Sequence, residues 1–369
     1  MDRFKRRNRE EWVQKSQDME KECTRRIKEV ATSFIRDPRQ IAEALQFGSR
    51  FYSYSVRNTQ LMYSQNPHAT YVQSFPAWKK LGYSVKRGET GMKIFVPVQV
   101  TLLSIDGNVV RLSDATKQQQ EDYHKGKIEG HMVTRFKLGT VFDIAQTTFP
   151  PEKYPELYSV GYPSELHEDI CKGLMDYARD EVHCNVKSED LHAITLRGFF
   201  NLSTNEIVVN SSLQGTQKLS TFAHELGHAI IHNSPSSKSV SRKELEADAL
   251  DIMIESGFGL ELTDARKDHL ASHYYRFEEE LKEALGSDIS EEKLMEGMDD
   301  VLSSVYGTYN DIIDSINLHV EKYVPLERLK DMTKDLEVDV EESFLQKGID
   351  KEISQESRSV DLDFDELER

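Results

Sequence analysis

The sequence has few cysteines and no long apolar run, and both absences narrow the class of protein. Only three cysteines occur in 369 residues, namely Cys23, Cys171 and Cys184, and such an odd, sparse set predicts reduced thiols rather than a disulfide framework. No stretch approaches the roughly 18 apolar residues of a transmembrane helix, and the first ten residues lack the apolar segment of a secretory signal. We therefore expect a cytoplasmic protein without a membrane partner.

The net charge of −17 hides two halves of opposite sign. Residues 1–150 hold 25 lysines and arginines against 16 acidic residues, whereas the remainder holds 22 against 48. A basic half can attract a polyanion such as nucleic acid, and an acidic half repels one. Two merely solvated surfaces would give the same counts, so the composition leaves both interpretations open.

The length predicts two domains, because single hydrophobic cores usually stop growing by about 300 residues. Apolar spacing of three and four over residues 9–35 predicts a long amphipathic helix, and Asp37-Pro38 predicts the start of a second helix that ends near Gly48. Strand patterns follow at 70–75, 92–103, 109–113 and 131–144, with a hairpin turn at 106–108 and a polar insertion at 114–128. Phe149-Pro150-Pro151 interrupts the chain, and we place a domain boundary there.

The second half is expected to be mainly helical. A helical pattern begins near Ser164, a second hairpin pairs residues 194–202 with 206–212, and helices dominate to about residue 330. The last 39 residues are acidic and poor in aromatics, which is typical of a loosely ordered tail. The prediction is an α+β protein in three parts: an N-terminal α+β domain (1–150), a mainly helical domain with a small β-sheet (151–330), and an acidic tail (331–369).

The strongest chemical signal is an HExxH motif that begins at His224. His224 and His228 are four residues apart on one face of an apolar-periodic helix, close enough for both imidazoles to bind one ion at about 2.0 to 2.1 Å. Glu225 is turned away from direct ligation and toward a metal-bound water, for which it can act as general base. The motif predicts a metallopeptidase with zinc, or another divalent ion, and with Glu225 as the catalytic residue.

A catalytic zinc site needs a third protein ligand, and the expected next helix offers several acids. Glu244 and Asp248 are four residues apart and share a helical face, whereas Glu246 points roughly the opposite way. We predict Glu244 as the third ligand and Asp248 as the carboxylate that fixes a ligand histidine, with Glu246 as the alternative ligand. Ser241 and Glu244 also match the capping box that begins many helices, so a purely structural role for Glu244 stays open.

Other residues near the motif are less informative. His232 lies eight residues, or roughly 12 Å, along the helix from His224, too far to share its ion on a straight helix; a histidine at a helix end is the simpler interpretation. The cluster His273-Tyr274-Tyr275 is the nearest candidate for a transition-state donor, with ordinary helix packing as the alternative. The hairpin over 196–209 could supply an edge strand along which an extended peptide aligns.

Three segments around the motif match a known pattern: GFFNLSTNEIVVNS, HELGH and ELEADAL. Together they resemble the ImmA/IrrE-type metallopeptidases over about residues 192–257. In such gluzincin-like sites the third ligand is the glutamate four residues before the aspartate of an Ala-Asp pair, which corresponds to Glu244 here. The resemblance implies a zincin-like domain and agrees with the helical-face argument.

Four segments of the first half match a second pattern: residues 58–62, 75–82, 85–91 and 141–147. They resemble the single-stranded-DNA-binding domain of ArdC-type antirestriction proteins and of the related LtrC-like plasmid proteins, which place this domain before a metallopeptidase-like one. The resemblance implies a protein of a plasmid, phage or other mobile element that binds single-stranded DNA and counters host restriction. The acidic tail departs from the family pattern.

Single-strand binders combine cations for the phosphates with aromatic faces for the bases, and both kinds of side chain alternate over residues 75–93. The residues predicted to bind DNA are Asn58, Phe75, Trp78, Lys79, Lys80, Lys86, Arg87 and Lys93. Phe75 and Trp78 are equally compatible with places in the core.

Three functions are therefore compatible with the sequence. The first is an antirestriction protein that joins single-stranded-DNA binding to a metal-dependent peptidase site. The second is a regulatory metalloprotease that cleaves a repressor or a restriction-enzyme subunit, and the third is a DNA-binding protein whose metal is structural and not catalytic.

Overall fold

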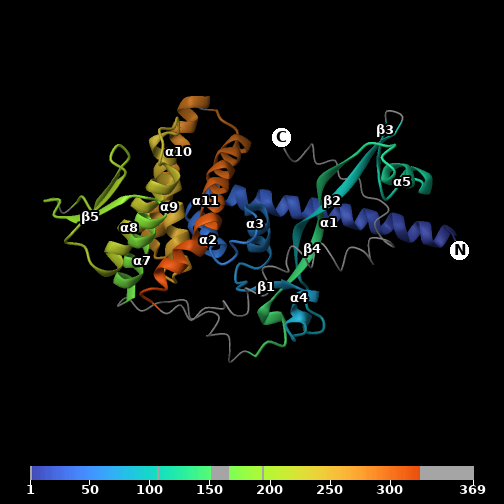
Figure 1. Ribbon diagram of the computed structural model, residues 1–369, viewed down its shortest axis with the longest axis horizontal. Coiled ribbons are helices and arrows are strands. Elements are labelled where there is room, and N and C mark those ends of the chain that lie inside the picture. The colour runs from blue at the N-terminus through green and yellow to red at the C-terminus, as the bar shows by residue number, and fades with distance from the viewer. Residues whose placement is uncertain (1, 106–107, 151–165, 193–194, 287, 325–369) are drawn as a thin grey trace. The chain divides into compact units, whose positions relative to one another are not determined.

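The computed structural model describes residues 2–105, 108–150, 166–192, 195–286 and 288–324 (Figure 1). The described residues form two compact units. The first comprises the residues up to Arg25 together with Val72–Phe149, and the second comprises Arg26–Tyr71 together with the described residues after Pro150. The predicted acidic tail, 331–369, lies outside the described residues.

The N-terminal helices agree with the periodicity of the sequence. The predicted long helix is α1 (Asp2–Arg36), and α2 (Arg39–Gly48) ends at the predicted glycine. The Asp37 carboxylate accepts a hydrogen bond from the Arg39 N–H at 3.3 Å, although Pro38 occupies the cap position itself. The next helix, α3 (Val56–Gln65), is capped by the Ser55 side chain, a favourable N-cap residue.

The first unit is built on a four-stranded antiparallel sheet of order β1 (Val72–Ser74), β4 (Gly130–Asp143), β2 (Met92–Ile105), β3 (Asn108–Arg111). All four strands were expected from the sequence. Two short helices accompany them, α4 (Phe75–Lys80) and α5 (Lys117–His124), with a single 3-10 turn, η1 (Ile144–Gln146). The segment expected to be a polar insertion thus contains a helix, which a capping box of Thr116 and Gln119 begins.

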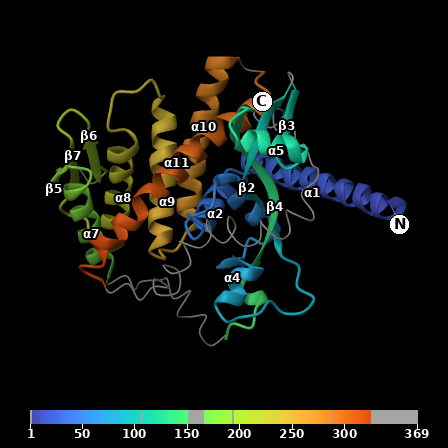
Figure 2. The ribbon, with the colours of Figure 1, turned by 45° about the vertical axis from the view of Figure 1, so that its right-hand side comes forward.

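The second unit packs helices against a three-stranded sheet (Figure 2). The predicted hairpin is β6 (Gly198–Asn201) with β7 (Glu206–Asn210), and β5 (Asn185–Glu189), which the sequence did not suggest, pairs with β7 in parallel. Its helices from the second half of the chain are α7 (His167–Asp180), α8 (Gly215–Ile231), α9 (Val240–Gly257), α10 (Asp264–Leu285) and α11 (Glu291–Val320). Together the two units confirm the predicted α+β class.

The core of the second unit surrounds α9, in which every residue from Leu245 to Glu255 is buried. A helix that is buried on all sides needs neighbours on all sides, and α9 contacts α2, α8, α10 and α11. Two early helices, α2 and α3, therefore fold with the second unit, although they precede the expected domain boundary at residue 150. The domain limits 1–150 and 151–330 stay a prediction.

None of the helices in the described ranges is long and apolar enough to cross a membrane.

Candidate metal centre

Close packing of α8 on α9 positions the site. A Cβ atom added at Gly227 would lie 3.2 Å from the Ala247 carbonyl oxygen and 3.3 Å from the Ala247 Cα. Only a glycine at this turn of α8 allows the two helix backbones to approach so closely. The approach brings the histidine face of α8 against the acidic face of α9.

The start of α8 is fixed from another helix. Gly215, in the left-handed conformation with φ 53°, is its first residue. Its N–H donates to the Glu168 carboxylate of α7 at 2.7 Å, and the Lys218 ammonium lies 3.1 Å from the same carboxylate. A carboxylate at a helix N-terminus satisfies a free N–H group and complements the helix dipole.

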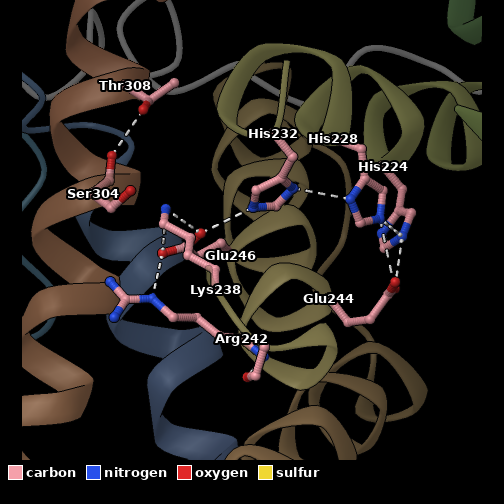
Figure 3. A network of polar contacts seen from close by, with 10 residues as sticks. His224, His228, His232, Lys238, Arg242, Glu244, Glu246, Ser304 and Thr308 are labelled. Carbon is pink, nitrogen blue, oxygen red and sulfur yellow. Dashed lines mark hydrogen bonds and ion pairs between the residues drawn. The ribbon is translucent and has the colours of Figure 1, made fainter. Parts of the chain in front are cut away.

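His224, His228 and Glu244 converge at one point (Figure 3). The His224 Nε2 and His228 Nε2 atoms are 3.2 Å apart, and the Glu244 Oε2 atom lies 3.5 Å from the first and 3.6 Å from the second. The two neighbouring histidines hold the pKa of Glu244 far below its usual range. The side chains are partly exposed, so the site opens to solvent.

This triangle of donor atoms fits a tetrahedral divalent ion. Ligands that bind at about 2.0 to 2.1 Å with tetrahedral angles lie about 3.4 Å from one another. The three observed distances of 3.2, 3.5 and 3.6 Å scatter around that value. Two imidazoles and one carboxylate also form a donor set that several divalent ions accept.

The Asp248 carboxylate contacts His224 on the Nδ1 side of its ring. Its Oδ1 atom lies 2.9 Å from the His224 Nδ1 atom, at hydrogen-bonding distance, and its side chain is only 2% exposed. Burial alone would lower the pKa of His224, but Asp248 and Glu244 raise it well above its ordinary value. Such a contact fixes the ring and its tautomer, so that Nε2 faces the site.

The second histidine has a support that the sequence argument missed. The His228 Nδ1 atom lies 3.0 Å from His232 Nδ1, and the His232 Nε2 atom lies 2.9 Å from the Glu246 carboxylate. Glu246 is fully buried and is neutralised by Lys238 at 2.7 Å and Arg242 at 3.0 Å. His232 ends α8 and links the site to this buried ion cluster (Figure 3). Its spacing of four residues from His228 was the available signal.

Glu225 lies beside the triangle and is partly buried. Burial raises the pKa of the Glu225 carboxyl, although the two neighbouring histidines and a hydrogen bond from the Phe200 N–H oppose the rise. Phe200 belongs to β6, an edge strand of its sheet that contacts α8. Gly198 in the same strand allows this contact, because a Cβ there would lie 2.9 Å from the Thr221 side chain.

The structure contradicts two alternatives that the sequence left open. The N-cap of α9 is Ser239, which accepts the Arg242 N–H, whereas Ser241 lies inside the helix and donates to Glu280. The capping-box interpretation of Glu244 is therefore wrong. Glu246 points to the other side of α9, at the ion cluster, so it is not positioned as the alternative ligand.

The three residues of the downstream cluster His273-Tyr274-Tyr275 differ in their surroundings. His273 is buried, with its Nε2 atom 3.5 Å from Asp248 Oδ2, so it faces the supporting carboxylate. Tyr274 is also buried, and burial raises the pKa of its phenol. Tyr275 is half exposed. A role as transition-state donor stays a prediction for all three.

Among the residues predicted to bind DNA, two are buried. Trp78 is 1% exposed, and its indole N–H donates to the Phe142 carbonyl. Asn58 is 8% exposed within α3 and belongs to the second unit. Their burial argues against direct contact with a base or phosphate in this conformation.

The other predicted DNA residues lie in the first unit. Phe75, Lys79, Lys80, Lys86 and Arg87 are exposed in or just after α4. The Lys86 ammonium donates to the Ala145 carbonyl, and Lys93 on β2 donates to the Thr140 hydroxyl at 2.7 Å. The structure thus gathers seven of the eight residues in one unit, with Trp78 buried among them, and their contact with DNA stays a prediction.

Two family models match the chain in the expected order. Residues 14–142 match the N-terminal domain of the anti-restriction factor ArdC, and residues 179–289 match the IrrE N-terminal-like domain of peptidase family M78. The second match contains the HExxH motif, Glu244 and Asp248. The chain therefore carries an ArdC-type N-terminal domain followed by an M78 peptidase-like domain, which confirms the resemblance drawn from the sequence.

The individual proteins that match the chain have low sequence identity to it. The uncharacterized protein pXO2-81 of Bacillus anthracis is 28% identical over 285 residues, which cover 70% of this chain and 48% of that protein, so the chain spans about half the length of this relative. Two crystal structures of the antirestriction protein ArdC from plasmid R388, one metal-free and one with Mn(II), are 14% and 15% identical. Each match covers 73% of this chain and 86% of the other, with TM-scores of 0.39 and 0.40.

Proposed function

We propose that this chain is an antirestriction protein of a mobile element that binds single-stranded DNA through its first unit and carries a metal-dependent peptidase site in its second. The observation that carries the peptidase part is the triangle of His224, His228 and Glu244 with Glu225 beside it. Zinc is the ion we expect, because the donor atoms fit tetrahedral ligation.

The residues around the site have separate roles in the proposed peptide hydrolysis. A divalent ion held by the three ligands would polarise a peptide carbonyl and acidify a water molecule. Glu225 takes a proton from the attacking water and passes it to the leaving amine. Because burial raises the pKa of its carboxyl, Glu225 is better matched to both transfers than an exposed glutamate. Asp248 and His232 keep the two imidazoles oriented.

The strand β6 is the proposed guide for a peptide substrate. It lies at the edge of the sheet, next to α8, and its Phe200 N–H reaches Glu225. An extended peptide that pairs with such an edge is held by backbone hydrogen bonds and so is accepted with little regard to sequence. The exposed side chain of Phe199 on this strand adds an apolar contact.

The proposed DNA surface follows one face of the β2–β4 ribbon. In register, Lys93 lies opposite Thr140, Phe95 opposite Leu138, and Pro97 opposite Phe136, so all six side chains share that face. Phe75 continues the row at its end, with its ring 6.3 Å from that of Phe142. Aromatic faces beside cations are what single-stranded nucleic acid needs.

The peptidase proposal is tested with Glu225→Gln in the full chain. The variant should retain its metal, measured by elemental analysis, and lose both cleavage of labelled casein and protection of unmodified phage in a restricting host. Glu261→Gln is the matched control, because Glu261 is exposed in the same unit. Cleavage of casein by Glu225→Gln at the wild-type rate would refute the general-base role.

Glu225→Gln, compared with His228→Gln and with a variant that does not bind DNA, separates the alternatives. If Glu225→Gln keeps antirestriction while His228→Gln unfolds the protein, the metal is structural. If Glu225→Gln loses antirestriction while DNA binding is dispensable, the chain is a regulatory protease of a repressor or a restriction subunit. Both outcomes contradict the proposal as stated.

The DNA proposal is tested by fluorescence anisotropy of the full chain on a labelled single-stranded oligonucleotide. The test variant replaces with alanine the exposed cations Lys79, Lys80 and Arg87, which lie in or just after α4, the helix that Phe75 begins at the end of the proposed surface. The matched control replaces three lysines near α5. Those control residues are Lys117, Lys125 and Lys127. Loss of three phosphate contacts should reduce the slope of log K against log salt by about 2. Equal losses in both variants would show a general charge effect and refute the proposed surface.

A further inference from the structure

A second pair of histidines lies on the other side of Asp248. His269 and His273 are four residues apart on α10, and their ring centroids are 4.8 Å apart, against 4.9 Å for His224 and His228. Their Nε2 atoms lie 3.4 and 3.5 Å from Asp248 Oδ2. Neither the HExxH motif nor the proposed peptidase chemistry uses this pair.

These contacts are poor hydrogen bonds but good spacings for ligands of one ion. An N–H···O hydrogen bond ordinarily spans about 2.7 to 3.2 Å, so both distances are too long. They match the roughly 3.4 Å between two ligands of a tetrahedral ion. The three donor atoms lie within 4.8 Å of one another.

The buried members of the cluster have polar atoms without partners. Asp248 is 2% exposed, yet its Oδ2 atom has no hydrogen-bond partner among the described residues, and the same holds for Nδ1 of His273. A buried carboxylate oxygen without a partner is costly. The neighbouring carboxylate of Asp251 already forms an ion pair with Arg266. Among the ion pairs of the described residues, Asp248 Oδ2 faces only the imidazoles of His269 and His273.

We propose that His269, His273 and Asp248 hold a second divalent metal ion, separate from the one expected at the HExxH motif. Two imidazoles and one carboxylate suit first-row divalent ions such as zinc and cobalt. His269 is 53% exposed and His273 only 8%, so the ion binds from the His269 side and completes its coordination with water.

Sharing of Asp248 couples the two ions. Its Oδ1 atom supports His224, which is a ligand of the first site, while its Oδ2 atom faces the second. A cation on Oδ2 draws negative charge away from the oxygen that makes His224 a stronger ligand. Each ion therefore weakens the binding of the other by the same factor.

The test is a titration of the metal-free full chain with Co²⁺, followed by visible absorption and calorimetry. The wild type should bind two equivalents, and His269→Gln one. His228→Gln should also bind one, with the spectrum of the second site. His68→Gln is the control for adventitious binding, because His68 is exposed elsewhere, and it should keep two. Because His269 is exposed, its replacement leaves the fold intact, which circular dichroism checks.

Each other outcome has a definite meaning. Two equivalents in both the wild type and His269→Gln would overturn the second site. One equivalent that His228→Gln abolishes would also overturn it and leave the proposed peptidase site standing. One equivalent that only His269→Gln abolishes would support the second site and contradict the first.

Discussion

Replacement of Gly227 by alanine should weaken metal binding and lower the stability of the fold only modestly. A Cβ at this position lies 3.2 Å from the Ala247 carbonyl oxygen, about 0.2 Å inside ordinary van der Waals contact. The obstacle is backbone on a buried helix, so α8 and α9 must separate. Glu244 on α9 then moves away from the two histidines on α8 by a similar distance.

The two effects of the substitution have opposite signs for stability. Alanine in place of glycine favours the helix by about 0.8 to 1.0 kcal/mol, and the crowding costs about 1 to 3 kcal/mol, so the free energy of unfolding falls by at most about 2 kcal/mol. Metal sites tolerate ligand displacements of about 0.2 Å. A shift at that limit should lower the affinity on the order of tenfold, equivalent to about 1.4 kcal/mol.

The assay is competition for zinc against a chromogenic chelator, with urea unfolding of the metal-free protein measured in parallel. Gly307→Ala is the matched control, because Gly307 lies in α11 and a Cβ there meets nothing within 4 Å. That variant should gain about 1 kcal/mol of stability with unchanged zinc affinity. Unchanged affinity in Gly227→Ala would show that the spacing of α8 and α9 does not set the ligand triangle.

Three further predictions concern the groups around the site. Asp248→Asn should lower the affinity of the first site by about 10- to 100-fold and remove the second Co²⁺ equivalent; two tight equivalents in this variant would contradict its shared role. Chelation of an ion present at about 100 times its Kd should remove about 2.7 kcal/mol of stability and lower Tm by about 5 to 11 °C, whereas Tm of His228→Gln, scanned alongside, should respond less. Burial alone would raise the pKa of Glu168, but bonds from Gly215 and Lys218 bring it below its ordinary 4.5, so its contribution is present above pH 4.5 and lost as pH falls through the lowered pKa. Glu168→Gln should therefore flatten the acid limb of a stability profile, and an unchanged limb would refute this.

The sequence could predict the ligand triangle because the spacing of the ligands along each helix is a local property of the chain. His224 and His228 share a face through helical periodicity alone, and Glu244 with Asp248 repeats the same spacing on the next helix. One packing contact, at Gly227, then brings both faces together. That these residues bind metal is a prediction, which the experiments above test.

The surroundings of the triangle could not be predicted, because they depend on packing between distant segments. The i,i+4 spacing of Arg242 and Glu246 suggests an ion pair, but the sequence does not indicate that this pair is in the core or that Lys238 joins it. His269 and His273 match a ligand pattern only once Asp248 is known to face them. Trp78 was ambiguous for a related reason, since an aromatic residue among lysines suits both a binding surface and a core.

The place of α2 in the core also constrains how the chain folds during synthesis. Its apolar side chains, among them Ile41 and Leu45, are buried in the same cluster as Leu245 of α9. At about 5 to 20 residues per second, a ribosome needs about 10 to 40 s to make the roughly 200 residues between the two helices. For that time α2 can contact α3 but lacks its native partners α9 and α10. Expression at high synthesis rates should therefore favour aggregation through this helix, and a chaperone that covers short apolar segments should raise the soluble yield.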